Sequence, residues 1–319
     1  MEKILIPTCG KVIPASRRGL TRLAMVARLT LSITMATAVA ASPSALAHDN
    51  ATPIGTAVSE LPLFDAHVHY KQEAWTPYPL QTVLELFDRN GVAMALVSST
   101  PDEGTIRLFE FAPNRIVPEV RPYHDGVTSS NWTSADGIAD YLQGRLEAHP
   151  HQGIGEFHIH GEAMWHEPLM RRVIAMARER SIPLHVHSGS QPVRWIYAMD
   201  PGVTVIWAHA GLGERAEAIH ELMGEFPTLY ADTSLREREI LGDGNLDPIW
   251  RRIIIDFQDR LMVGSDTWIN AQWDRYDDIV ESNRRWLALL PRDIAEKIAY
   301  RNAARLFGRD VSMKLIGTR

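Results

Sequence analysis

The stretch that decides the fold is Leu63-Phe64-Asp65-Ala66-His67-Val68-His69. It begins as an apolar run of the kind found in buried parallel strands, and it closes on two histidines two residues apart. Because successive side chains of a strand alternate between its faces, His67 and His69 point to the same side. Two imidazoles placed in this way can chelate one cation.

Seven further apolar runs follow and alternate with amphipathic stretches. The runs as a whole cover residues 61–68, 92–98, 116–121, 153–158, 182–187, 203–209, 228–232 and 261–266, and helical patterns cover 79–90, 133–148, 167–180, 214–225 and 276–290. Eight strand-then-helix units in about 250 residues predict an α/β fold of the (β/α)8 TIM-barrel type with a parallel eight-stranded core. A doubly wound sheet is the competing fold, but no G-x-G-x-x-G follows the first run. Residues 292–307 are expected to form an extra C-terminal helix on the outside.

Composition excludes several classes of protein. The 319 residues carry a formal charge of −6, which argues against a nucleic-acid partner because phosphate-binding proteins concentrate Lys and Arg. Cys9 is the single cysteine, so the chain can form neither an intrachain disulfide nor a thiolate zinc site. Any metal must therefore be held by histidines and carboxylates.

The N-terminal segment has the pattern of an export signal. Basic residues that include the pair Arg17-Arg18 precede an apolar stretch over residues 29–41, and Ala45-Leu46-Ala47 is typical of a signal-peptidase site. The apolar stretch is too short to span a bilayer comfortably. We expect a cleaved signal peptide over residues 1–47, a linker over 48–60 and one domain over 61–319. The mature protein would be periplasmic or secreted without a membrane anchor, by the Sec or the twin-arginine route.

Ionisable residues fall at the carboxyl ends of the predicted strands. Glu156 ends the fourth run, His187 the fifth, His209 the sixth and Asp266 the eighth. Any one of these histidines, taken singly, is more simply a hydrogen-bonded structural residue. Together with His67 and His69 they converge on one mouth of a barrel, which is where barrel enzymes carry their active sites.

The motifs also have a family resemblance. They read D-A-H-V-H-Y, G-I-G-E-F-H, P-L-H-V-H-S-G, V-I-W-A-H-A-G, V-G-S-D and R-N-A-A-R-L-F-G. Over residues 61–308 the chain resembles the amidohydrolase superfamily, specifically the amidohydrolase-2 and TatD-like metal-dependent hydrolases. The resemblance implies that His67 and His69 bind a first metal and that Glu156 takes the bridging position. It places His187 and His209 as further ligands and Asp266 as a ligand that also moves protons.

The number of metal ions stays open at this stage. Many relatives use a carboxylated lysine as the bridge, but no lysine lies between residues 72 and 296, so Glu156 is the only obvious bridge. A Glu156 that instead orients a ligand histidine would leave one ion, with His209 positioning the water. Imidazole and carboxylate ligands favour zinc, with manganese or iron as alternatives.

These observations predict hydrolysis of an amide, ester or lactone bond in a small molecule by a metal-activated water, with Asp266 and His209 as catalytic residues. Arg121 and Trp268 are candidate substrate-binding residues, for an anionic group and an apolar body. Further residues that could line the barrel mouth and contact a substrate are Arg194, Arg236, Trp75, Trp132, Trp165 and Trp273. Association with further copies of the chain stays open.

Two other functions stay open as well. One is a metal-dependent non-oxidative decarboxylase, in which arginines would grip the substrate carboxylate. The other is a non-catalytic binding protein, which would have no need of Asp266. Among the remaining histidines, His185 is expected to fill a barrel layer or hydrogen-bond a ligand. We expect His124, His158, His160 and His166 on loops at the barrel mouth and outside the metal site. Surface positions are the commoner outcome for such histidines, and contact of some of them with a substrate stays open.

Overall fold

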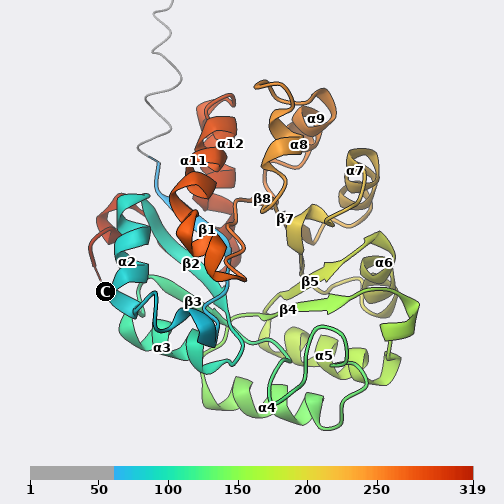
Figure 1. Cartoon of the computed structure of the whole chain (residues 1–319). Helices are drawn as coiled ribbons and strands as arrows, with labels where there is room; N and C mark the ends of the chain where they lie inside the picture. Colours follow the sequence, from blue (N-terminus) through green and yellow to red (C-terminus); the bar gives the residue numbers. More distant parts are fainter. Residues whose placement is uncertain (1–60, 319) are drawn as a thin grey trace, which may run out of the picture. The chain divides into compact units, whose positions relative to one another are not determined.

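Eight parallel strands lie at the centre of the computed structural model, which describes residues 61–318 (Figure 1). The predicted signal segment and linker, with Cys9, lie outside the described residues. Every predicted run overlaps one of the strands. They are β1 (Leu63–Val68), β2 (Val92–Ser98), β3 (Ile116–Glu119), β4 (Ile154–Ile159), β5 (Leu184–Ser188), β6 (Val205–Trp207), β7 (Leu229–Asp232) and β8 (Leu261–Met262). β4 and β5 each extend one residue beyond their runs.

The strands form two parallel sheets that meet along two seams. One sheet has the order β1-β2-β3 and the other the order β4-β5-β6-β7-β8. At the first seam Val120, just after β3, pairs with Ile154 of β4. At the second, Ala66 of β1 donates its backbone N–H to the carbonyl of Val263 (2.9 Å), and Asp266 donates to that of His67 (2.7 Å). The strand order therefore closes on itself, as the predicted (β/α)8 barrel requires.

Helices follow the strands along the chain and surround them (Figure 1). All five predicted helical patterns contain helices of the structure. Within residues 61–318 no helix is both long and apolar enough to cross a membrane. The helices are α2 (Leu80–Arg89), α3 (Glu103–Phe111), α4 (Ile138–Ala148), α5 (Glu167–Arg180), α6 (Ser190–Met199), α7 (Ala216–Glu225), α8 (Glu237–Leu241), α9 (Pro248–Asp256), α10 (Asn270–Asp274), α11 (Tyr276–Leu287), α12 (Arg292–Glu296) and α13 (Asn302–Leu306).

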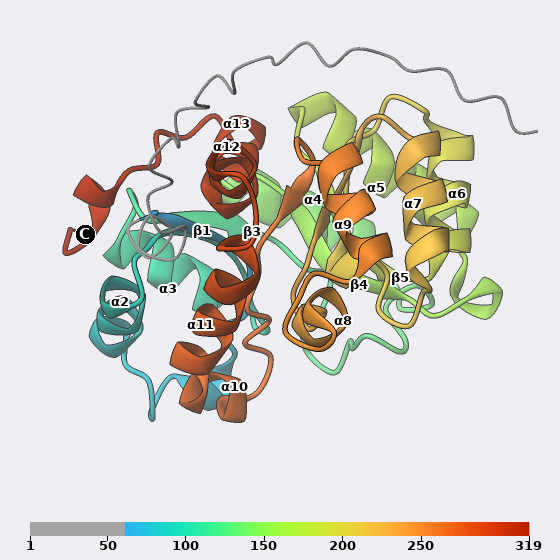
Figure 2. The same cartoon turned by 90° about the horizontal axis from the view of Figure 1, so that it is seen from above.

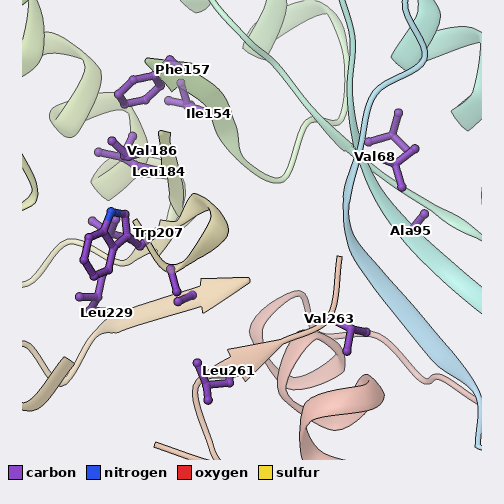
Figure 3. Close-up of a cluster of buried hydrophobic side chains, with 14 of the residues drawn as sticks. Val68, Ala95, Ile154, Phe157, Leu184, Val186, Trp207, Leu229, Leu261 and Val263 are labelled. Atoms are coloured by element: carbon purple, nitrogen blue, oxygen red, sulfur yellow. The ribbon is translucent and has the colours of Figure 1, made fainter. Parts of the chain in front are cut away.

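The main apolar core lies between the strands and the helices. In β5, Leu184 and Val186 belong to this core, whereas His185 between them faces the barrel interior and is 1% exposed. The same alternation places Trp207 of β6 and Leu229 of β7 in the core (Figure 3). Strand alternation therefore leaves the interior positions free for polar side chains at the carboxyl ends.

A second apolar cluster fills the other end of the barrel. Phe64 and Ala66 of β1 pack there with Ala303 and Phe307, and the rings of Phe64 and Phe307 stack with centroids 5.8 Å apart. The side chain of Asn302 donates to the carbonyl of Leu261 at the start of β8 (2.8 Å). The expected extra C-terminal helix is thus present as α12 and α13, but it packs across the amino ends of the strands rather than on the outside (Figure 2). Its apolar residues complete the apolar cluster at the amino ends of the strands.

Candidate metal centre

Four donor atoms meet inside the barrel mouth, and they come from β1, the residue directly after it, β4 and the segment after β8. Nε2 of His67 lies 3.1 Å from Nε2 of His69. Oε2 of Glu156 lies 3.7 Å and 3.2 Å from these two nitrogens, and Oδ1 of Asp266 lies 3.6 Å and 3.3 Å from them. All four residues are buried.

The donor set fits a divalent cation. A tetrahedral zinc ion with ligand bonds of about 2.0–2.2 Å needs donors about 3.3–3.6 Å apart. The two Nε2 atoms lie 3.1 Å apart and 3.2–3.7 Å from the carboxylate oxygens, which is close to this requirement. Neutral imidazoles and carboxylates are also the ligand types that zinc, manganese and iron accept.

The second oxygen of Glu156 faces two more histidines. Its Oε1 lies 2.7 Å from Nδ1 of His187 and 3.4 Å from Nε2 of His209. His209 Nε2 is also 4.0 Å from Oδ2 of Asp266. All six residues proposed as metal ligands from the sequence therefore come together, with Glu156 between two groups of donors. Which of them bind metal stays a prediction.

Hydrogen bonds on the far side of each ring aim the histidines inward. Nδ1 of His69 donates to the carbonyl of Ser98 (2.7 Å), and Nδ1 of His67 donates to Asp232 Oδ2 (3.2 Å). Nδ1 of His209 lies 2.8 Å from the hydroxyl of Ser234. Because each Nδ1 is occupied, the lone pair of each Nε2 is directed at the shared centre.

Asp232 is a candidate functional residue that the sequence reasoning missed. It ends β7, is fully buried, and accepts hydrogen bonds from His67 and from Nε2 of His185 (3.3 Å). Nδ1 of His185 in turn lies 3.1 Å from Glu119 at the end of β3. Both carboxylates occupy strand ends, which is the signal that identified Glu156 and could have identified them. His185 has the expected supporting place behind a candidate ligand.

The electrostatics of the centre favour a positive charge. Burial opposes the charged form of His67, but Asp232, Glu156 and Asp266 outweigh it and hold its pKa well above the usual range. Burial would raise the pKa of Glu156, yet His67 and hydrogen bonds to His187 and His209 hold it well below the usual range. For Asp266 the balance is similar, since His67 and His69 lower its pKa against burial. The centre therefore concentrates carboxylate charge that a divalent cation would neutralise.

Three of the predicted strand ends are wrong in detail. β4 continues to Ile159, so Glu156 lies within this strand rather than at its end. β6 ends at Trp207 and β8 at Met262, so His209 and Asp266 lie beyond them. Both residues have left-handed backbones, with φ of 56° and 52°, which cannot continue a strand. Such a conformation costs on the order of 1–3 kcal/mol per residue and clusters at functional sites. Here it turns both side chains back toward the centre.

A glycine makes the turn after β6 possible. Gly211 has φ of 70°, and a Cβ at this position would lie 2.0 Å from the ring of Trp207. Only glycine accepts both the conformation and the close approach. The turn that presents His209 thus depends on the G of the A-H-A-G motif.

A pocket of about 500 Å³ opens over the centre. Trp268 and Arg121, the two substrate-binding candidates, both line it. Its other lining residues are Lys71, Thr100, Tyr123, Val127, Thr128, Ser129, Glu156, His158, His187, Leu212, Leu235 and Asp266. The pocket gives a small molecule access to Glu156 and Asp266.

Arg121 is engaged with the centre itself. Its Nε donates to the carbonyl of Glu156 (3.1 Å) and its Nη2 to the Oε2 of the same residue (3.2 Å). The guanidinium also lies over the ring of Tyr123, 4.5 Å from the centroid. Arg121 therefore positions Glu156, and its role toward a substrate stays a prediction.

The remaining mouth candidates lie away from the pocket. Arg194 pairs with Glu221 (3.2 Å) and Glu225, and Arg236 donates to the carbonyl of Glu214 (2.8 Å). The four other tryptophans do not line the pocket. They are Trp75, which lies under Arg107, Trp165, which packs on Trp195, and the buried Trp132 and Trp273.

Comparison with known proteins agrees with this architecture. Residues 64–309 match the Amidohydro_2 family, described as amidohydrolase. The chain belongs to the amidohydrolase family. It is accordingly a metal-dependent hydrolase. The buried clusters of histidines and carboxylates fit a divalent metal site of such an enzyme.

Several solved structures share the fold. A TatD homologue from Escherichia coli K12 is 16% identical, with 78% of this chain and 98% of that chain covered and a TM-score of 0.55. A proposed 2-pyrone-4,6-dicarboxylic acid hydrolase from Pseudomonas putida is 16% identical, with 79% and 100% covered and a TM-score of 0.54. Dihydroorotase from Campylobacter jejuni is 12% identical, with 83% and 88% covered and a TM-score of 0.53. No curated protein matches the sequence.

Proposed function

We propose that the chain is an exported enzyme that hydrolyses an ester, lactone or amide bond in a small anionic molecule. One observation carries the hydrolytic part of this proposal. Nε2 of His67 and Nε2 of His69 lie 3.1 Å apart and 3.2–3.7 Å from carboxylate oxygens of Glu156 and Asp266, beneath a pocket of about 500 Å³. Such pockets with a few convergent polar groups are the usual form of an enzyme site.

The residues of the centre have three roles: they would bind the metal, move the proton and position Glu156. A divalent cation held by His67, His69, Glu156 and Asp266 would supply Lewis-acid activation of a water and of the substrate carbonyl. Asp266 lines the pocket and is kept ionised by its histidine neighbours, so it can accept the proton of the attacking water and return it to the leaving group. Arg121 and His187 hold Glu156 in place through its two carboxylate oxygens.

The pocket wall supports an anionic substrate with an apolar body. Lys71 lines the pocket, and within the described part of the chain its ammonium has no acidic partner. Leu212, Leu235 and Trp268, which are 44%, 38% and 48% exposed, line the same pocket. An unpaired cation beside exposed apolar side chains suits a carboxylate joined to a ring or acyl chain.

The test of the hydrolytic mechanism is the Asp266→Asn variant. The amide leaves an oxygen in place but cannot accept a proton, so kcat should fall by about 100-fold or more with metal largely retained. Wild-type protein beginning at His48 is first screened over lactones, esters, amides and carboxylated aromatics, with metal content measured in parallel. Near-normal turnover of the variant would rule out the mechanism. Release of carbon dioxide without hydrolysis would instead identify a decarboxylase.

The test of the substrate class is the Lys71→Met variant. Losing a charge-assisted contact of this kind should raise KM for an anionic substrate about 10-fold and leave its uncharged methyl ester unaffected. Lys314→Met is the matched control, because it removes the same charge outside the pocket. An equal KM for wild type and Lys71→Met on the anionic substrate would count against the anionic class.

Metal identity and export have their own tests. We propose zinc as the bound metal, and elemental analysis of protein purified without added metal checks it, with manganese or iron as the contradicting results.

For export, we expect cleavage after Ala47 and His48 as the mature N-terminus. N-terminal sequencing of fractionated cells checks this. An intact chain confined to the cytoplasm would contradict it.

A further inference from the structure

The hydroxyl of Tyr123 makes two hydrogen bonds to the same residue. It lies 2.8 Å from the backbone nitrogen of His158 in β4 and 2.8 Å from Nδ1 of the ring of His158. Tyr123 follows β3 and is 4% exposed. The double contact ties the ring of His158 to its own backbone through one oxygen.

This arrangement determines where the ring carries its proton. The backbone N–H of His158 can only donate, so the Tyr123 oxygen accepts there. The hydroxyl proton then needs an acceptor, and in residues 61–318 the only one within reach is Nδ1 of His158. A neutral imidazole whose Nδ1 accepts has its proton on Nε2. The hydrogen-bond network thus assigns the Nε2–H tautomer to His158.

The Nε2–H group of His158 is available to a ligand. His158 lines the pocket beside Glu156 and His187, and its ring stacks on that of His187 with centroids 4.1 Å apart. Nε2 has no hydrogen-bond partner among the described residues, and it is not among their buried unpartnered atoms. A polar hydrogen with fixed direction therefore borders the space above the centre.

We propose that His158 is a substrate-binding catalytic residue that donates from Nε2–H to the oxygen of the scissile carbonyl, with Tyr123 as its positioning residue. The proposal rests on the hydrolytic function proposed above. A fixed neutral donor stabilises the negative charge that develops on this oxygen, and it needs no reorganisation during the reaction. The stack on His187 and the bond to Tyr123 hold the ring in its plane.

Activity measurements on His158 variants form the first half of the test. Removing one such donor typically lowers kcat about 100- to 1,000-fold. We expect His158→Ala to show a loss of this size, with KM and metal content close to wild type. His158→Gln should recover part of the activity, because the glutamine amide can reach the Nε2 position, whereas His158→Asn should not. His160→Ala is the control, since His160 is exposed and does not line the pocket.

The second half of the test does not depend on turnover. Nitrogen-15 NMR of the metal-free full-length protein should show His158 as the Nε2–H tautomer in wild type and as a mixture in Tyr123→Phe. A kcat of His158→Ala within two-fold of wild type, loss of metal in this variant, or an Nδ1–H tautomer in wild type would overturn the proposal. A wild-type protein that hydrolyses nothing would refute the proposed function, while the NMR result still decides the tautomer.

Discussion

His67 is contacted on both edges of its ring, and this makes it the residue on which the centre depends. Its Nε2 faces His69, Glu156 and Asp266, while its Nδ1 donates to Asp232. One imidazole thus joins the donor atoms to a carboxylate behind them. The pairing of a histidine ligand with a buried carboxylate fixes the ring orientation and raises its basicity as a ligand.

Glu156 is the residue that distinguishes one metal ion from two. Its Oε2 faces His67 and His69, and its Oε1 faces His187 and His209. If the carboxylate bridges two ions, Glu156→Gln should lower the metal content from two ions per chain toward one and reduce turnover, because a neutral amide cannot hold two cations. Elemental analysis after exhaustive dialysis measures this.

The control for the bridging prediction is Glu162→Gln, a change of the same type at an exposed residue on the same side of the barrel. It should leave the metal content as in wild type. One ion per chain before and after Glu156→Gln would contradict the bridge and leave Glu156 as a residue that orients its neighbours.

At the scale of elements, a series of side-chain hydrogen bonds links three strands. Glu119 ends β3, His185 lies within β5 and Asp232 ends β7, and hydrogen bonds of 3.1 Å and 3.3 Å link them through His185. Asp232 then accepts from His67 on β1. The position of His67, one candidate ligand, therefore depends on how four strands are placed relative to one another.

His185→Ala should weaken metal binding about 10- to 100-fold, because Asp232 loses the partner that holds it against His67. Competition with a chromophoric chelator measures the affinity, and the absorption spectrum of the cobalt-substituted protein should change with it. His185→Gln should recover affinity, since the glutamine amide can donate to Asp232 from the Nε2 position.

The matched control for this prediction is His220→Ala. His220 makes the same type of bond to a carboxylate, Asp256 at 2.8 Å, but on the surface. It should leave affinity and spectrum unchanged. If His185→Ala binds metal as tightly as wild type, the hydrogen bonds through His185 support only the packing of the barrel.

Element positions were largely predictable, because apolar runs and helical periods depend on residues close together in the chain. The same reasoning brought His67, His69 and Glu156 together, since His67 and Glu156 lie on strands and His69 follows directly after one. Asp232 also ends a strand, but its hydrogen bonds to His67 and His185 join segments that are distant in sequence, so its supporting role was not apparent. The engagement of Arg121 with Glu156 joins two segments in the same way. Such partners become visible only when the barrel brings its strands together.

At the scale of the whole molecule, the candidate centre joins the two sheets. His67 belongs to the sheet of β1, β2 and β3 and His69 follows directly after β1, whereas Glu156 belongs to the sheet of β4 to β8. Asp266 follows β8 and donates its backbone N–H across the seam to His67. An ion held by these residues would thus connect strands on both sides of the two seams.

Metal removal should therefore destabilise the entire barrel rather than one loop. Because the unfolded chain lacks the assembled ligands, free metal at 1,000 times its Kd adds about 4 kcal/mol to the free energy of unfolding. For a domain of this size that corresponds to a fall in Tm on the order of 10 °C when a chelator strips the metal. Calorimetry with and without chelator measures this change in Tm.

The His67→Ala, His69→Ala double variant is the control and should melt at one temperature in both conditions. A wild-type Tm that stays the same after verified metal loss would mean that the two sheets hold together without the ion, with the apolar layer of Phe64 and Phe307 as the connection that remains.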